Sequence, residues 1–147
     1  MNKPDEALSC FKETFGCSQA VFSTYATEMG LDRETALRVA GAFGGGMARM
    51  GETCGAVTGA FMLIGLKYGQ TKADDGAAKK KTYQLVHEFV EKFKERNQSI
   101  VCRELLGVHP GTPEGLQAFK EKDLKNTICA KLVRDAAEIV EEILEIE

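Results

Sequence analysis

Five cysteines could carry chemistry in this chain, and Cys54 stands in the most informative setting. The glycine-rich residues 41–51 lead almost directly into it, and an apolar helix is expected to begin beside it. A thiol in the first turn of a helix faces unpaired backbone N–H groups and the positive end of the helix dipole, and both favour the thiolate. Because the thiolate attacks disulfides and binds metals, Cys54 is predicted to be the most thiolate-like cysteine.

The other four cysteines are Cys10, Cys17, Cys102 and Cys129. Cys10 and Cys17 are one heptad apart, and all other separations are long, so that any other pairing depends on the fold. On an unbroken helix the Cα atoms of Cys10 and Cys17 would lie about 10 Å apart, beyond the ~7 Å reach of a disulfide. No Cys-x-x-Cys pair occurs, which argues against a thioredoxin-like motif and the common zinc-knuckle spacings. His87 and His109 are isolated, so a histidine-rich metal site is not expected.

The same thiols also fit a purely structural role. Free cysteine is among the most buried residue types and behaves as a small hydrophobe. Cys17, Cys102 and Cys129 each share a predicted helix face with apolar neighbours. The chemical interpretation therefore requires that the fold brings the sulfur atoms together.

The glycine run does not match a phosphate-binding loop. An acid, Glu52, follows Gly51 where a Walker loop needs lysine, and no strand precedes the run as a dinucleotide fold requires. A turn that uses positive φ angles is the favoured interpretation. An anion at the start of the following helix remains open, with Arg49 as its support, and Arg103 could lower the pKa of a thiol near Cys102.

The hydrophobic pattern is helical almost throughout and predicts an all-α single domain over residues 1–147 with about six helices. Gly16 is expected to interrupt the first helical region, and Asp32 to cap the next helix. Further helices are expected from about Glu52 to Tyr68, across residues 83–93, through Cys102–Leu106 after a Ser99 cap, from Pro113 after a Thr112 cap, and from Cys129 to Leu144, where the apolar residues form one stripe. Gly51, Gly55 and Gly59 recur every four residues and predict close packing of one helix face.

Composition narrows the function classes. The net charge is −3 and no large basic block occurs, so nucleic acid is not expected as a partner. Residues 1–6 lack the apolar core of a signal peptide, and the apolar residues 56–66 are far fewer than the ~20 that a membrane helix needs. Without membrane insertion, a cytoplasmic location is inferred. Structural disulfides are rare there, so five cysteines favour redox chemistry or metal binding.

Several segments together resemble one known family. They are Gly16–Val21, the turn Gly44–Met47, Gly51–Gly59, Cys102–Gly107, and Cys129 with Val133–Ala137. This set resembles the C_GCAxxG_C_C family over nearly the whole chain, and its members are described as candidate redox-active proteins. The four hallmark cysteines fall on Cys17, Cys54, Cys102 and Cys129, and Cys10 lies outside the set. The resemblance implies a redox role and an association with transporter loci.

Three hypotheses follow. In the first, the four hallmark cysteines cluster for thiol–disulfide exchange or electron transfer with an unknown redox partner; Cys102 or Cys17 would pair with Cys54, and Arg49 and Arg103 would give electrostatic support. In the second, the same four thiolates hold zinc or an iron–sulfur cluster without turnover. In the third, the cysteines are core residues of a transporter-associated interaction domain, and the acidic last helix, beside its apolar stripe, docks on a partner or on a second copy as a homodimer.

Overall fold

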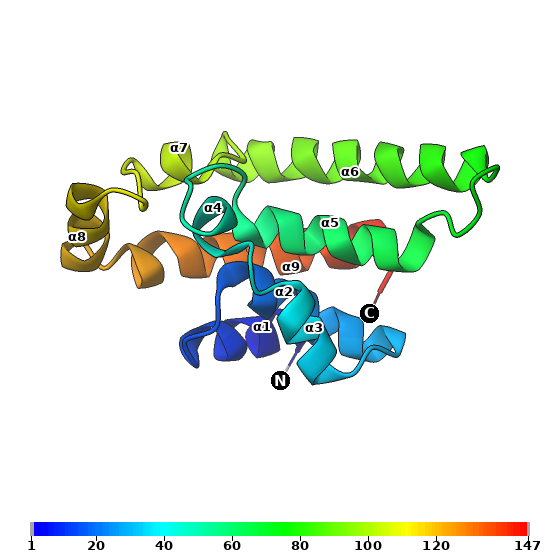
Figure 1. Cartoon of the computed structure of the whole chain (residues 1–147), viewed down its shortest axis with the longest axis horizontal. Helices are drawn as coiled ribbons and strands as arrows, with labels where there is room; N and C mark the ends of the chain where they lie inside the picture. The colour runs from blue at the N-terminus through cyan, green and yellow to red at the C-terminus, as the bar shows by residue number, and fades with distance from the viewer. Residues whose placement is uncertain (1, 147) are drawn as a thin grey trace.

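The computed structural model describes residues 2–146, and it confirms the all-α prediction, since no strand occurs in this part of the chain (Figure 1). The structure has more helices than the predicted six or so, because several of them are short segments. The helices are α1 (Lys3–Lys12), α2 (Cys17–Ala26), α3 (Arg33–Val39), α4 (Gly44–Met47), α5 (Gly55–Tyr68), α6 (Gly76–Asn97), α7 (Cys102–Leu106), α8 (Pro113–Glu121) and α9 (Ala130–Leu144). A π-helical turn, Lys125–Cys129, leads into α9.

Of the three helix-capping residues predicted from the sequence, two cap a helix in the structure. The Asp32 carboxylate accepts the N–H of Thr35 at 3.0 Å at the start of α3. At the start of α8, the Thr112 hydroxyl accepts the N–H of Gly115 at 3.0 Å. Ser99 does not cap α7, because its hydroxyl accepts the N–H of Val101, the residue that precedes the helix.

Gly16 separates α1 from α2, as predicted. α1 ends at Lys12, and Gly16 takes an extended conformation as the cap of α2. The Gln19 amide oxygen accepts the Gly16 N–H at 2.9 Å, and its amide nitrogen donates to the carbonyl of Leu37 in α3. This bracing makes Cys17 the first residue of a helix.

The core forms around α9, which lies behind α5 in Figure 1 and packs against α1, α2, α5 and α6. The apolar stripe predicted for this helix is buried inside the molecule: Leu132, Val133, Ala136, Ala137, Val140, Ile143 and Leu144. Tyr25 reaches it from α2, and its hydroxyl donates to the Glu141 carboxylate at 2.9 Å. The stripe is therefore not free to dock on a partner, and docking through the acidic face of this helix stays a prediction.

Helices α2 and α5 approach closely along two of the three predicted glycines. A Cβ at Gly59 would lie 3.0 Å from the Ser18 carbonyl oxygen, and one at Gly55 would lie 3.1 Å from the Ser18 nitrogen. Gly51 does not belong to this face, because it precedes α5 and has a φ of +70°. Gly55 and Gly59 therefore allow α5 to pack directly against the first turn of α2.

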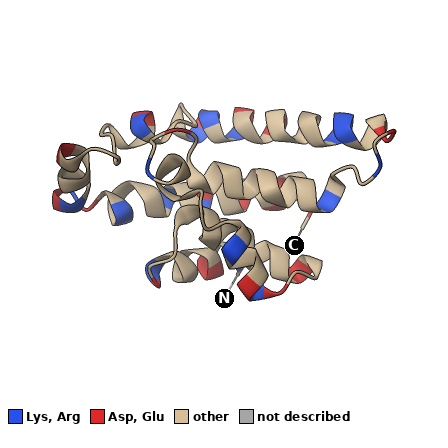
Figure 2. Cartoon of the chain, in the orientation of Figure 1, with Lys and Arg blue, Asp and Glu red and all other residues tan. Residues whose placement is uncertain are grey.

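Charges of both signs are dispersed over the helices, as Figure 2 shows, and neither sign forms a block. Between residues 2 and 146, no helix combines the length and the apolar character needed to cross a bilayer.

Candidate functional site: a cavity lined by four cysteines

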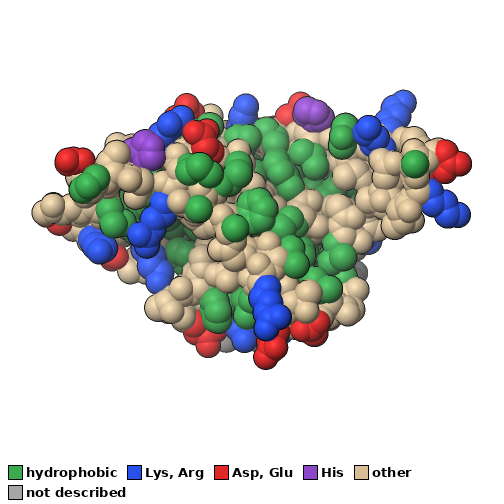
Figure 3. Space-filling view, in the orientation of Figure 1, with side chains coloured by type: hydrophobic (Ala, Val, Ile, Leu, Met, Phe, Trp, Pro, Cys, Tyr) green, Lys and Arg blue, Asp and Glu red, His purple; other side chains and the backbone are tan. Residues whose placement is uncertain are grey.

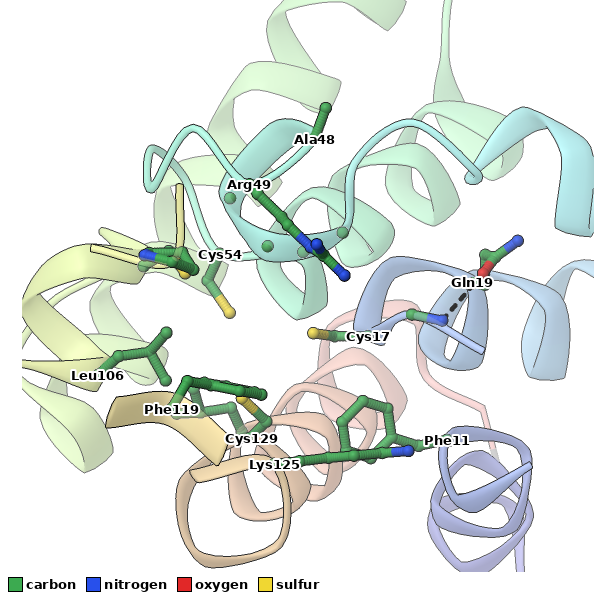
Figure 4. Close-up of a pocket in the computed structure, with 18 of the residues that line it drawn as sticks. Phe11, Cys17, Gln19, Ala48, Arg49, Cys54, Leu106, Phe119, Lys125 and Cys129 are labelled. Atoms are coloured by element: carbon green, nitrogen blue, oxygen red, sulfur yellow. Dashed lines mark hydrogen bonds between the residues drawn. The ribbon is translucent and has the colours of Figure 1, made fainter. Parts of the chain in front are cut away.

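Four cysteines from remote parts of the chain line one cavity of about 570 Å³: Cys17, Cys54, Cys102 and Cys129. Figure 4 shows the sulfur atoms of Cys17 and Cys54 pointing into this space, with Cys129 beyond Phe119. Cys10 lies elsewhere, with its sulfur 3.8 Å from the Ser23 hydroxyl. The fold therefore separates the four hallmark cysteines from the fifth.

Each of the four occupies a defined place relative to a helix. Cys17 is the first residue of α2, and Cys102 is the first residue of α7. Cys54 immediately precedes α5 and so caps this helix rather than lying within its first turn. Cys129 ends the π-helical turn and continues directly into α9, so no free helix start faces it. Single π-helical turns occur frequently at functional sites.

Backbone hydrogen bonds hold the segments of Cys54 and Cys102 side by side. The Cys54 N–H donates to the Ile100 carbonyl at 2.8 Å, and the Cys102 N–H donates to the Glu52 carbonyl at 2.6 Å. Between them, Thr53 and Val101 form an isolated antiparallel bridge. This pairing joins two segments that lie almost fifty residues apart in sequence, which no local pattern indicates.

The glycine run forms a left-handed turn against the cavity. Positive φ angles begin at Gly45 (69°) and Gly46 (70°) and continue through Met47, Ala48 and Arg49. For a non-glycine residue this conformation costs roughly 1–2 kcal/mol, and such strain concentrates at functional sites. A Cβ at Gly46 would lie 2.7 Å from the Cβ of Cys102, so only glycine permits this approach. The predicted positive-φ turn is confirmed, and it is longer than the glycines alone indicate.

Cys17 has the thiolate-favouring surroundings. A hydrogen bond with the Cys129 thiol lowers the pKa of Cys17, and this effect is supported by the backbone N–H groups of Cys17 and Gly45 and by the charge of Lys125. Burial opposes these contributions, but the net direction is down. Among the four, the half-buried Cys17 is therefore the thiol whose surroundings most favour ionisation.

The other three thiols are held in the protonated form. Burial and the nearby charge of Cys17 raise the pKa of Cys54, although the N–H groups of Ala56 and Val57 act in the opposite direction. Burial, with the Cys17 charge, raises the pKa of Cys102 to about 12. The hydrogen bond to Cys17, followed by burial, raises the pKa of Cys129. The prediction that Cys54 is the most thiolate-like cysteine is therefore wrong.

The basic residues also differ from expectation. Arg49 lines the cavity, as its predicted role requires. Arg103 lies outside it, with its guanidinium 3.7 Å from the Glu52 carboxylate, and its support of a thiolate stays a prediction. Lys125 was not singled out from the sequence. Its position one helical turn before Cys129 is the signal that could have identified it.

The arrangement of possible donor side chains bears on the metal hypothesis. Within residues 2–146, no three His, Cys, Asp or Glu side chains are placed to hold a metal ion together. The four cysteines as they stand do not fit zinc or an iron–sulfur cluster.

Comparison with known proteins gives one match. A family model described as "Putative redox-active protein (C_GCAxxG_C_C)" covers residues 15–143. No curated protein and no solved structure matches the chain.

Proposed function

This chain belongs to the C_GCAxxG_C_C family, and we propose that it is a thiol–disulfide redox protein in which Cys17 attacks and Cys129 resolves. The observation that supports this assignment most is that Cys17 and Cys129 line the same cavity, where Cys129 lowers the pKa of Cys17 and Cys17 raises the pKa of Cys129. A nucleophile and a proton-bearing partner that face one cavity are what two-step disulfide exchange requires.

In the first step, the Cys17 thiolate attacks one sulfur of a substrate disulfide. A bond forms between Cys17 and that sulfur, the substrate S–S bond breaks, and the other half leaves as a thiolate. The negative charge of Cys17 is consumed in this step. Cys129 then loses the hydrogen bond and the neighbouring charge that raised its pKa.

In the second step, Cys129 passes its proton to the departing thiolate and attacks the Cys17 sulfur. The Cys17–Cys129 disulfide forms, and the second half of the substrate leaves as a thiolate. The substrate has gained two electrons, and the two cysteines have lost them. An external dithiol is the class of reductant that would restore the protein.

The proposal assigns Cys54 and Cys102 to a later stage. The charge of Cys17 contributes to raising the pKa of both thiols, so its consumption makes both of them easier to ionise. The two residues are already held together by backbone hydrogen bonds around them. They would form a second dithiol that exchanges with the first.

Trapping the mixed disulfide tests this order of events. Fully reduced protein is treated with bis(2-hydroxyethyl) disulfide, quenched with acid and examined by mass spectrometry. We expect Cys129→Ser to stop as a stable adduct on Cys17, because the resolving thiol is absent. Wild-type protein and the control Cys54→Ser should pass through to an internal disulfide without accumulating the adduct. An adduct on another cysteine, or resolution in Cys129→Ser as fast as in wild type, would overturn the proposal.

A further inference from the structure

The cavity around Cys17 has the size and walls of a small-molecule site. Its volume of about 570 Å³ lies within the range of 300–1,000 Å³ typical of such sites. Apolar side chains from several helices form most of its lining, among them Phe11, Phe15, Leu106, Leu116 and Phe119. Figure 3 shows the surface hollowed beside α8, with basic side chains at the edge of the hollow.

The charges of the cavity have one sign. Arg49 and Lys125 line it, and no aspartate or glutamate does. In Figure 4 these two side chains lie on opposite sides of Cys17. Within residues 2–146, the Arg49 guanidinium has no ion pair or side-chain hydrogen bond. The Lys125 ammonium has no carboxylate partner there either, and it lies 5.2 Å from the centre of the Phe11 ring.

Two unpaired cations beside an apolar wall are complementary to an organic anion. A ligand with an apolar chain and terminal carboxylates would place its chain against the aromatic and leucine side chains and its charge near Arg49 or Lys125. The half-buried position of Cys17 also disfavours a disulfide held rigidly on the surface of a folded protein. Resting on the proposed function, we propose that the cavity takes small organic disulfides that carry carboxylate groups.

A matched series of aliphatic disulfides tests the inference: dianionic 3,3′-dithiodipropionate, neutral bis(2-hydroxyethyl) disulfide and dicationic cystamine. Each accepts two electrons and leaves as two thiol molecules, while Cys17 and Cys129 become a disulfide. A free thiolate attacks the anionic member most slowly, because like charges repel. We expect the protein to invert this order, with dithiodipropionate reacting at least tenfold faster than cystamine. The rate is followed by acid quenching and mass spectrometry.

Two variants remove the same charge at different places. Arg49→Gln should reduce the ratio of the dithiodipropionate rate to the cystamine rate at least fivefold. Arg103→Gln, whose side chain lies outside the cavity, should leave that ratio within twofold of wild type. The free-thiol order in wild type, or equal ratios in the two variants, would overturn the substrate class while the internal disulfide still formed. If none of the three disulfides reacted at Cys17, the proposed function itself would fail.

Discussion

The ionisation of Cys17 results from a balance of opposing influences on one sulfur atom. Burial raises a thiol pKa, and at Cys54 the backbone N–H groups of the helix start do not outweigh it. At Cys17 the same kind of N–H group acts together with a thiol donor, Cys129, and a cation, Lys125. A helix start alone is therefore too weak to favour a buried thiolate here, and the additional donor and charge decide which cysteine ionises.

The contribution of Lys125 can be measured by removing its charge. Lys125→Gln should raise the pKa of Cys17 and slow its alkylation by iodoacetamide at pH 7 by about threefold, because a smaller fraction is thiolate. Lys122→Gln removes an equal charge from an exposed position near the same turn and should leave the rate unchanged. Peptide mapping after brief labelling gives the rate at Cys17. Equal rates in the two variants would show that Lys125 does not act on the thiolate.

At the scale of helices, the packing of α5 against α2 places Cys17 beside the turn that carries Gly45. Ser18, the neighbour of Cys17, contacts α5 through its backbone, and its hydroxyl donates to the Ala40 carbonyl at 2.8 Å. A side chain at Gly55 or Gly59 would push these two helices apart. The placement of the thiolate thus depends on glycine at positions some distance from it in sequence.

Two glycine-to-alanine changes on α5 separate this packing effect from helix propensity. Gly59→Ala should destabilise the protein by about 1–2 kcal/mol, since the new methyl group meets the backbone of α2 in a close-packed interior. Gly65→Ala has open space around the new Cβ and should stabilise the protein by about 0.5–1 kcal/mol through better helix propensity. Urea unfolding under reducing conditions measures both. The idea of a required close approach fails if Gly59→Ala is as stable as Gly65→Ala.

The elements that follow local rules were predictable from sequence, and the site was predictable only in part. The break at Gly16, the Asp32 and Thr112 caps and the stripe of α9 all depend on residues near one another in the chain. The backbone pairing of the segments that carry Cys54 and Cys102 depends on long-range packing, and so does the approach of Cys129 to Cys17. The prediction that Cys54 is the most thiolate-like cysteine was wrong because it required knowledge of burial and of neighbours from other helices.

For the whole molecule, the cavity couples folding stability to pH. Cys54, Cys102 and Cys129 have pKa values in the folded state above the ordinary value of about 8.5. They therefore stay protonated in the folded protein at pH values where they ionise in the unfolded chain, which favours unfolding as the pH rises above about 8.5. Cys17, with a lowered pKa, acts in the opposite direction only below about pH 8.5, where the unfolded thiol still holds its proton, so it does not offset the loss at higher pH.

The free energy of unfolding should therefore fall between pH 8 and pH 10 in the presence of a reductant. Each of the three thiols contributes at most about 1.4 kcal/mol per pH unit. The double variant Cys54→Ser, Cys102→Ser lacks two of these contributions and should lose distinctly less stability over the same interval. Urea titrations at the two pH values measure the difference. An identical loss in the double variant and in wild type would contradict the raised pKa values.

The identity of the first disulfide formed on oxidation tests the central claim most directly. Reduced wild-type protein is oxidised with less than one equivalent of bis(2-hydroxyethyl) disulfide, the free thiols are alkylated in acid-quenched samples, and the linked peptides are identified by mass spectrometry. The account predicts that Cys17 is joined to Cys129 while Cys10, Cys54 and Cys102 are alkylated. A first disulfide between Cys54 and Cys102, or one that includes Cys10, would contradict it.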